Sequence, residues 1–137
     1  MIEYIKHEHH NTHIYQSDKI DIVSESAFSV IKKLCLDHLV TYEGYVKAIQ
    51  VKYQKKQLIP LVLSDEISLI PLLRVRDYEN IWVNSVEIKA LKVKKSGFSI
   101  TFMSGNTLEV SKSITGFKNA LNLANMIKNE KVKHFHS

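Results

Sequence analysis

The sequence contains little cysteine, proline or glycine and has no long apolar run. Its 137 residues include one cysteine (Cys35), two prolines and four glycines. A single cysteine excludes an internal disulfide and a zinc site built on paired cysteines, and it fits a reducing cytoplasm. No apolar run approaches the roughly 20 residues of a membrane helix, and the first residues lack the apolar stretch of a signal peptide. We therefore expect a cytoplasmic globular protein that forms a single domain over residues 1–137.

The motifs of common catalytic sites are also missing. The sequence has no G-x-S-x-G, no H-E-x-x-H, no Walker loop and no Gly-x-Gly fingerprint. Two acidic pairs, Asp65/Glu66 and Asp77/Glu79, fall in turn-like segments, where carboxylates usually act as turn or capping residues. Cys35 lies on or beside an apolar helical stripe, as expected of a buried structural thiol. We infer that the protein is not an enzyme and needs no cofactor.

Histidines gather near both ends of the sequence. One cluster comprises His7, His9, His10 and His13, and the other comprises His134 and His136. Imidazole binds zinc, copper and nickel, but neither cluster follows the period of a helix or strand that would hold the ligands in place. We interpret both clusters as polar terminal segments rather than metal sites. A metal protein that uses these histidines is the alternative, and elemental analysis tests it.

The first half of the sequence predicts two helices after a short strand. Residues 1–15 mix polar groups with histidines and are interpreted as a mobile or edge segment. Lys19–Val23 has the alternation of a short strand. Ser24 is a candidate N-cap for a helix that ends before Thr41. Tyr42–Tyr53 is a second amphipathic segment with helical spacing.

The second half is dominated by alternating apolar residues. Pro60 keeps the apolar segment around it out of a central ladder position. From Ile81 onward, alternation and two turns, at 94–97 and 104–106, predict a three-stranded antiparallel meander. Beyond an N-cap at Ser113 or Thr115, an apolar stripe follows helical period. The predicted class is α+β, an antiparallel β meander packed against a few helices, including a C-terminal helix. The apolar face of the meander is predicted to comprise Val86, Ile88, Ala90, Phe98, Ile100, Phe102, Leu108 and Val110.

Positive charge is concentrated in the later part of the chain. The net charge is +5. Residues 1–45 carry 4 basic and 7 acidic side chains, whereas residues 46–137 carry 15 basic and 7 acidic ones. A field of one sign over most of a small domain attracts polyanions. Nucleic acid, an anionic membrane surface and an acidic protein are all candidate partners.

Basic residues cluster within about fifty positions, and we take most of them as the candidate phosphate-contacting set. Tyrosines at 42, 45, 53 and 78 lie between them, where stacking on bases is one role and packing at a surface edge is the more common one. The loop with Arg74 and Arg76 and the turn with Lys94 and Lys95 are expected to contact phosphates. The alternative is an ordinary solvated face. The candidate residues are Arg74, Arg76, Lys92, Lys94, Lys95, Lys47, Lys52, Lys55 and Lys56.

An ordered series of residues resembles the competence transcription factor family, ComK. Residues 71–84 have a proline after a short apolar run, then a polar loop, then Trp82 opening a strand. Residues 101–109, Thr-Phe-Met-Ser-Gly-Asn-Thr-Leu-Glu, are similar to the family's hairpin. The resemblance covers roughly residues 35–119, and no single motif in it is specific. Further positions at family-like spacing are Cys35, Tyr42-Glu43-Gly44, Lys47-Ala48, Pro60, Ser113 and Phe117-Lys118-Asn119.

The resemblance implies a bacterial DNA-binding regulator of genes for DNA uptake. Family members are understood to activate transcription and to bind AT-rich double-stranded DNA, largely through the minor groove, as dimers. A narrow AT-rich minor groove has enhanced negative potential that attracts Lys and Arg side chains. Reading of the major groove would need a recognition helix with base-reading side chains, and the sequence shows none. No membrane partner is expected.

Two departures from the family pattern limit what is carried over. The gap between Pro60 and Pro71 is shorter than in the family pattern. The sequence also ends at Ser137, without the further segment that carries adaptor recognition and regulated proteolysis in the well-known member, so this regulation is not inferred here. The rival hypotheses are a non-catalytic module that binds an acidic protein or anionic surface, and a sheet-based output domain of the LytTR type.

Overall fold

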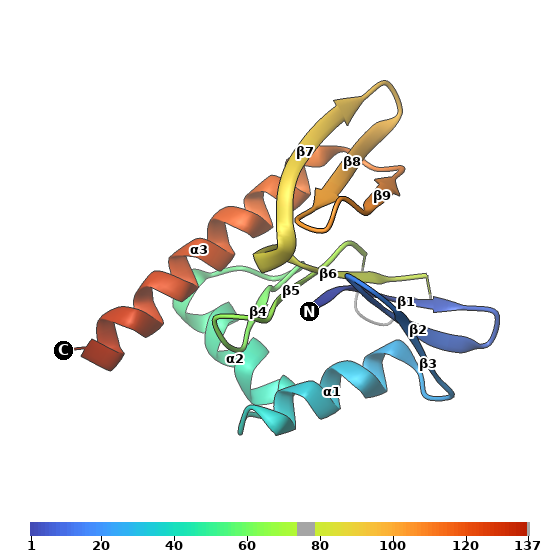
Figure 1. Cartoon of the computed structure of the whole chain (residues 1–137). Helices are drawn as coiled ribbons and strands as arrows, with labels where there is room; N and C mark the ends of the chain where they lie inside the picture. The colour runs from blue at the N-terminus through green and yellow to red at the C-terminus, as the bar shows by residue number, and fades with distance from the viewer. Residues whose placement is uncertain (74–78, 137) are drawn as a thin grey trace.

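The computed structural model describes residues 1–73 and 79–136, with side chains as far as residue 133. The described residues form two antiparallel sheets, three α-helices and one short 3₁₀ turn (Figure 1). This α+β architecture, with a C-terminal helix, confirms the predicted fold class. The elements are β1 (Ile2–Glu8), β2 (Asn11–Gln16), β3 (Ile20–Val23), α1 (Ala27–Asp37), α2 (Tyr42–Tyr53), β4 (Leu61–Val62), β5 (Ser68–Pro71), β6 (Ile81–Asn84), η1 (Ser85–Glu87), β7 (Ile88–Lys94), β8 (Gly97–Phe102), β9 (Thr107–Val110) and α3 (Ile114–His136).

The larger sheet has six strands in the order β3-β2-β1-β6-β5-β4. Its N-terminal hairpin corrects the interpretation of residues 1–15 as a mobile or edge segment. These residues form β1 and most of β2, and β1 lies inside the sheet because it pairs with β6 as well as with β2. Ile5, opposite Trp82 of β6, is fully buried. The polar residues Glu3, Lys6 and His7 hide the strand pattern of β1 in the sequence, and its partner strand β6 comes from the second half of the chain.

Helices α1 and α2 begin at capped positions close to those that the sequence predicts. The N-cap of α1 is Ser26 rather than Ser24, because the Ser26 side chain accepts the N–H of Ser29 at 3.1 Å. Helix α2 covers the predicted segment Tyr42–Tyr53, and the Thr41 side chain accepts the N–H of Gly44 at its start. Gln54 adopts the left-handed conformation that ends the helix. In Figure 1 both helices lie below the six-stranded sheet.

The smaller sheet, β7-β8-β9, is the predicted meander, but it does not begin at Ile81. Residues 81–84 instead form β6 of the larger sheet, and the turn η1 redirects the chain into β7. The buried Asn84 side chain sets this break. Its Oδ1 accepts the N–H groups of Ser68 and Val86, and its Nδ2 donates to the carbonyls of Ile2 and Glu66. Because these bonds hold Asn84 against three segments of the chain, β6 ends at this residue, although the apolar alternation in the sequence continues beyond it.

A bulge in β7 also corrects the predicted apolar face. The register slips between Ile88 and Ala90, so that Ile88 lies opposite Phe102 whereas Leu91 lies opposite Ile100. Leu91 therefore takes the inward position predicted for Ala90, and Ala90 is exposed. Beyond the bulge the strand leaves the core, because Val93, the next residue on the same face as Leu91, is 63 % exposed.

Helix α3 joins the two sheets. Its N-terminal end packs against the meander, where the rings of Phe98 and Phe117 lie 5.4 Å apart, and further along it contacts β4 and β5. The predicted apolar stripe is buried at Phe117, Ala120, Ala124 and Ile127, with Leu123 added. The Ser113 side chain accepts the N–H of Thr115 at 3.3 Å, which agrees with Ser113 as the predicted N-cap. Among the described residues, no helix is long and apolar enough to cross a membrane.

Candidate functional site

The turn between β7 and β8 carries three of the candidate lysines, Lys92, Lys94 and Lys95, which we call the hairpin lysines. Lys94 closes the hairpin opposite Gly97, and Lys92 lies opposite Ser99. Gly97 has a φ of +155°, and a Cβ there would lie 2.0 Å from the Val110 carbonyl oxygen of β9. Only glycine fits this close approach of strands. In Figure 1 the turn projects from the top of the molecule, away from α1 and α2.

The hairpin lysines are exposed, and their charges are only partly compensated. Lys94 Nζ lies 2.9 Å from Glu109 Oε1 on β9, and both side chains are largely open to solvent. Within the described part of the chain, neither Lys92 nor Lys95 has an ion-pair partner. An exposed ion pair of this kind contributes little to stability. Two uncompensated ammonium groups and one weakly paired group therefore lie at the β7–β8 turn or within two residues of it.

The other candidate lysines lie on a different part of the molecule. Lys47 and Lys52 belong to α2, and Lys55 and Lys56 follow its end; we call these four the helix lysines. Lys52 pairs with Glu130 of α3 at 2.5 Å, and Lys55 is half-buried. Figure 1 shows α2 at the bottom of the molecule and the β7–β8 turn at the top. The structure therefore divides the basic stripe of the sequence into two separate groups.

The interleaved tyrosines of α2 serve packing rather than an open stacking surface. Tyr42 is half-buried and meets Phe28 edge to face, with ring centroids 4.9 Å apart. Tyr45 is buried, and its hydroxyl oxygen accepts the N–H of Val62 at 2.8 Å. Burial raises the pKa of Tyr45 to about 12. Of the two roles weighed for these residues, packing is the one that the structure confirms at Tyr42 and Tyr45.

Arg74 and Arg76, as well as Asp77 and Tyr78, lie outside the described residues. The flanking residues Leu73 and Glu79 line a hollow of about 560 Å³ between the two sheets, together with Lys6, His7 and Lys112 among others. Lys112 Nζ donates to the Leu72 carbonyl at 3.2 Å. The lining of this hollow is mixed in charge, because Glu79 and Glu109 lie in it beside Lys6 and Lys112.

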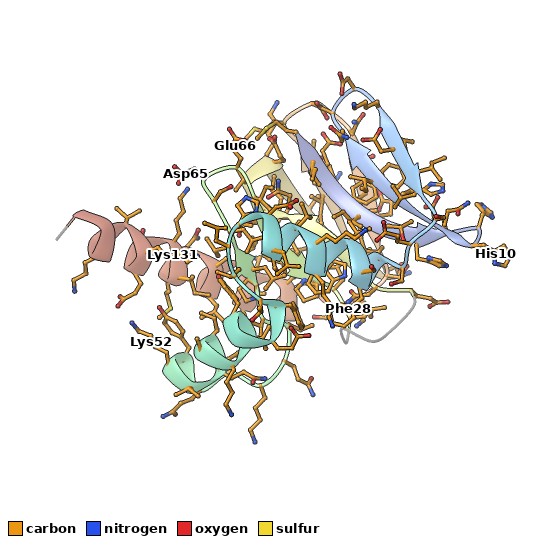
Figure 2. The ribbon with its side chains drawn as sticks, turned by 90° about the horizontal axis from the view of Figure 1, so that it is seen from below. His10, Phe28, Lys52, Asp65, Glu66 and Lys131 are labelled. Carbon is orange, nitrogen blue, oxygen red and sulfur yellow. The ribbon has the colours of Figure 1, made fainter. Side chains whose placement is uncertain are left out.

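A second basic feature was not singled out from the sequence. Lys128 and Lys131 of α3 line an apolar groove of about 470 Å³ beside β4, with Val62 and Leu63 in its wall. Lys131 Nζ donates to the Val62 carbonyl at 2.6 Å and lies 5.0 Å from the centre of the Tyr45 ring. Burial lowers the pKa of Lys131. Figure 2 shows Lys131 and Lys52 at the same end of the molecule. The i, i+3 spacing of Lys128 and Lys131 on a helix was the available signal.

The remaining candidates for chemistry lie apart from one another. His9 and His10 form the β1–β2 turn with positive φ angles, and His13 Nδ1 lies 3.2 Å from Glu8 Oε2. Among the described residues, no group of three or more His, Cys, Asp or Glu side chains is arranged to hold a metal ion. Cys35 is fully buried, as predicted, and burial raises the pKa of its thiol.

Comparison with known families gives one match. The family model described as ComK protein matches residues 1–134. Neither the curated proteins nor the solved structures give a match. The matched region includes β1 and β2, which lie outside the residues that carried the resemblance in the sequence.

Proposed function

The chain belongs to the ComK family of competence transcription factors, and from this premise we propose that it regulates genes for DNA uptake by binding AT-rich double-stranded DNA. The hairpin lysines enter or straddle the minor groove, and the protein acts in the cytoplasm as an activator. Residues 1–137 act as one DNA-binding domain. The observation that carries the proposal is the projecting β7–β8 turn, with Lys94 and Lys95 at the turn and Lys92 two residues before it on β7.

The shape of the hairpin suits a groove. A two-stranded ribbon is one of the elements that proteins place in a DNA groove, and a narrow A·T-rich minor groove concentrates negative potential. Lysine side chains at a ribbon tip reach into such a groove with little rearrangement of the body behind them. Because the ribbon is anchored to β9 by the Gly97–Val110 approach, its tip is held in place before DNA binds.

The charge at the tip supports the same interface. Among the residues that the structure describes, Lys92 and Lys95 have no acidic partner to give up, and Lys94 exchanges an exposed carboxylate for a phosphate. Each phosphate contact releases condensed counterions, which favours binding at low salt. Lys52, by contrast, must break its pair with Glu130 before it contacts DNA. Arg74 and Arg76, which lie outside the described residues, remain part of the proposed interface because they add two positive charges to the basic part of the sequence.

Fluorescence anisotropy across a salt series tests the interface. The probes are two duplexes of equal length, one AT-rich and one GC-rich. The double variant K92A/K95A is expected to weaken binding to the AT-rich duplex at least tenfold and to reduce the salt slope by about 2, because two phosphates are no longer neutralised by lysine. The matched control K47A/K56A removes the same charge from two exposed lysines on α2 and just after its end. It is expected to change the slope by less than about 0.5.

The outcomes separate the interface from the function. If K47A/K56A lowers the slope and K92A/K95A does not, the interface lies on the helix lysines instead. If R74A/R76A leaves binding unchanged, these two residues are removed from the site. Equal affinity for both duplexes would leave only a basic surface and would overturn the AT-rich proposal. No binding at low salt would overturn DNA binding itself and favour an acidic protein or anionic surface.

A further inference from the structure

The outer side of α3 carries a row of lysine and asparagine side chains. Their spacing of three or four residues places them on one side of the helix, and all of them are exposed. The buried stripe from Phe117 to Ile127 occupies the opposite side. We call this row the asparagine face, and it consists of Lys118, Asn122, Asn125, Asn129 and Lys133.

The polar groups of the asparagine face are unused within the described part of the chain. None of its three amides forms a hydrogen bond to another described residue, and neither Lys118 nor Lys133 has an ion-pair partner there. The acidic residue of α3, Glu130, is directed at α2, where it pairs with Lys52. The face therefore offers two positive charges and three amide groups, without a carboxylate among its own residues.

Asparagine is a poor residue for an exposed position in a helix. Its short side chain competes with the helical backbone for hydrogen bonds, and it ranks below lysine, glutamate, glutamine and alanine as a helix former. A helix side that only faces water gains support from Glu–Lys pairs four residues apart, and the asparagine face has none. Three asparagines in this row therefore lower the stability of α3, and a binding role gives a reason for them.

We propose that the asparagine face of α3 is a second DNA-contacting surface, which lies against the phosphate backbone beside the groove that the hairpin lysines enter. This inference rests on the proposed function. Lys118 and Lys133 neutralise phosphates, and the three amides donate hydrogen bonds to phosphate oxygens. At the rise of an α-helix the face is about 22 Å long, a length over which a duplex presents several successive phosphates.

The chemistry of the asparagine face fits DNA better than a protein partner. Protein interfaces are enriched in aromatic residues and depleted in lysine, whereas this face has two lysines and no aromatic residue. Met126 at its margin is 54 % exposed, but a lone methionine supplies little of the area that a stable protein interface buries. Interfaces with DNA are polar and positively charged, and asparagine is among the residues that bond to phosphate oxygens.

The packing of α3 connects this face to the hairpin. The N-terminal end of α3 is fixed to the meander by the contact of Phe117 with Phe98, whose ring centroids lie 5.4 Å apart. In Figure 1, α3 begins beside the meander, and β4 and β5 lie to its right, so its outer side is turned away from the body of the molecule. Because phosphate contacts fix the register of a protein on a duplex, the asparagine face sets where the ribbon meets the groove.

Asparagine variants test the face with two readouts that move in opposite directions. The double variant N122A/N129A is expected to raise the melting temperature by about 3 °C, because alanine is the better helix former. In the anisotropy assay it is expected to weaken binding to the AT-rich and the GC-rich duplex alike by about tenfold, because hydrogen bonds to phosphate are lost. Its salt slope should change by less than about 0.3, since no charge is removed.

Lysine variants test the charge of the face. K118A is expected to lower the salt slope by about 1. The control K128A removes the same charge from the same helix, but from the side that lines the groove beside β4, and its slope should match the wild type.

The outcomes separate this inference from the proposed function. If N122A/N129A and K118A bind like the wild type, or if K128A lowers the slope as much as K118A, the proposal is overturned. A loss of affinity confined to the AT-rich duplex would mean that the face reads bases, and it would overturn the backbone contact. These results count against the face alone whenever the wild type binds DNA. A wild type that binds neither duplex would overturn the proposed function, and this inference with it.

Discussion

The two edge strands of the six-stranded sheet, β3 and β4, show that tertiary contacts decide whether the backbone groups of an edge strand are free to pair with another strand. Both edge strands are short, four residues for β3 and two for β4. The backbone of β4 is occupied by Tyr45, 17 positions away, and by Lys131, 69 positions away. The local sequence of β4 has no part in this protection. Strand β3 receives no such cover, although its isoleucines give it the stronger strand propensity. Edge protection thus depends on which side chains the fold brings past the strand.

The largest effect on stability is expected from removing the Tyr45 hydroxyl, which bonds to the edge strand β4. Tyr45→Phe removes the hydroxyl that accepts the Val62 N–H and leaves this buried donor without a partner. We expect a loss of about 2 kcal/mol in the free energy of unfolding. Urea denaturation, followed by the fluorescence of the buried Trp82, measures it. Tyr53→Phe, on the same helix but half-buried, is the control and should cost less than about 0.5 kcal/mol. Equal losses in both variants would show that Tyr45 does not close the edge.

The same hydroxyl predicts a dependence on pH. Burial raises the pKa of Tyr45 to about 12 from its usual value of 10.0, so the folded state holds this proton more tightly than the unfolded state does. The free energy of unfolding therefore falls as pH rises from 10 to about 12. At pH 11, ionisation of Tyr45 is expected to account for a loss of about 1 kcal/mol. Urea titrations at pH 9 and pH 11 should show a smaller loss in Tyr45→Phe than in the wild type. An identical loss in both would assign the alkaline transition to other groups.

Removing the second group at the closed edge should cost less. Lys131→Met keeps an apolar stem over the Tyr45 ring but removes the donor to the Val62 carbonyl. Since the Tyr45 hydroxyl also lies 3.3 Å from this carbonyl, the oxygen is not left alone. The expected loss is about 0.5–1 kcal/mol by urea denaturation. A loss larger than that of Tyr45→Phe would reverse the order of the two groups.

The smallest effect on stability is expected from a substitution on the other edge strand, β3. Ile22→Thr keeps a β-branched side chain on β3, and Ile22 is 60 % exposed in the single chain. At concentrations where the chain is monomeric, we expect a change of less than about 0.5 kcal/mol. Thermal unfolding by circular dichroism in dilute solution measures it. A loss near that of Tyr45→Phe would mean that β3 is already covered within one chain.

Elements whose pattern is local could be predicted from the sequence. Helix α2 has its own cap and helical spacing, and its predicted bounds agree with the structure. The turns at Gly97 and Gly105 depend on glycines with positive φ, and both lie where the sequence indicated. The stripe of α3 is apolar at 3.6-residue period, and it is buried. In each case a few neighbouring residues determine the conformation.

Features set by distant contacts could not be predicted. The apolar alternation that begins at Ile81 does not indicate where β6 ends and β7 begins. The break at η1 depends on bonds from the Asn84 side chain to residues up to 82 positions away. The basic stripe was predicted as one surface, but the fold separates the helix lysines from the hairpin lysines. The pair of Lys52 with Glu130 spans 78 positions, and no local signal indicates it. Charge counts give a total, whereas a binding surface depends on where the fold places each charge.

The position of β1 has a consequence for synthesis of the protein on the ribosome. β1 pairs with β6 as well as with β2, so residues 4–6 find their β6 partners only when residues 81–83 have emerged. The β1–β2 hairpin forms early, but half of the larger sheet and the cover from α3 come from the later part of the chain. Long-range pairing of this kind slows folding. The growing chain must therefore expose the apolar residues of β1 for most of its translation, and it is during this period that we expect chaperones to bind it.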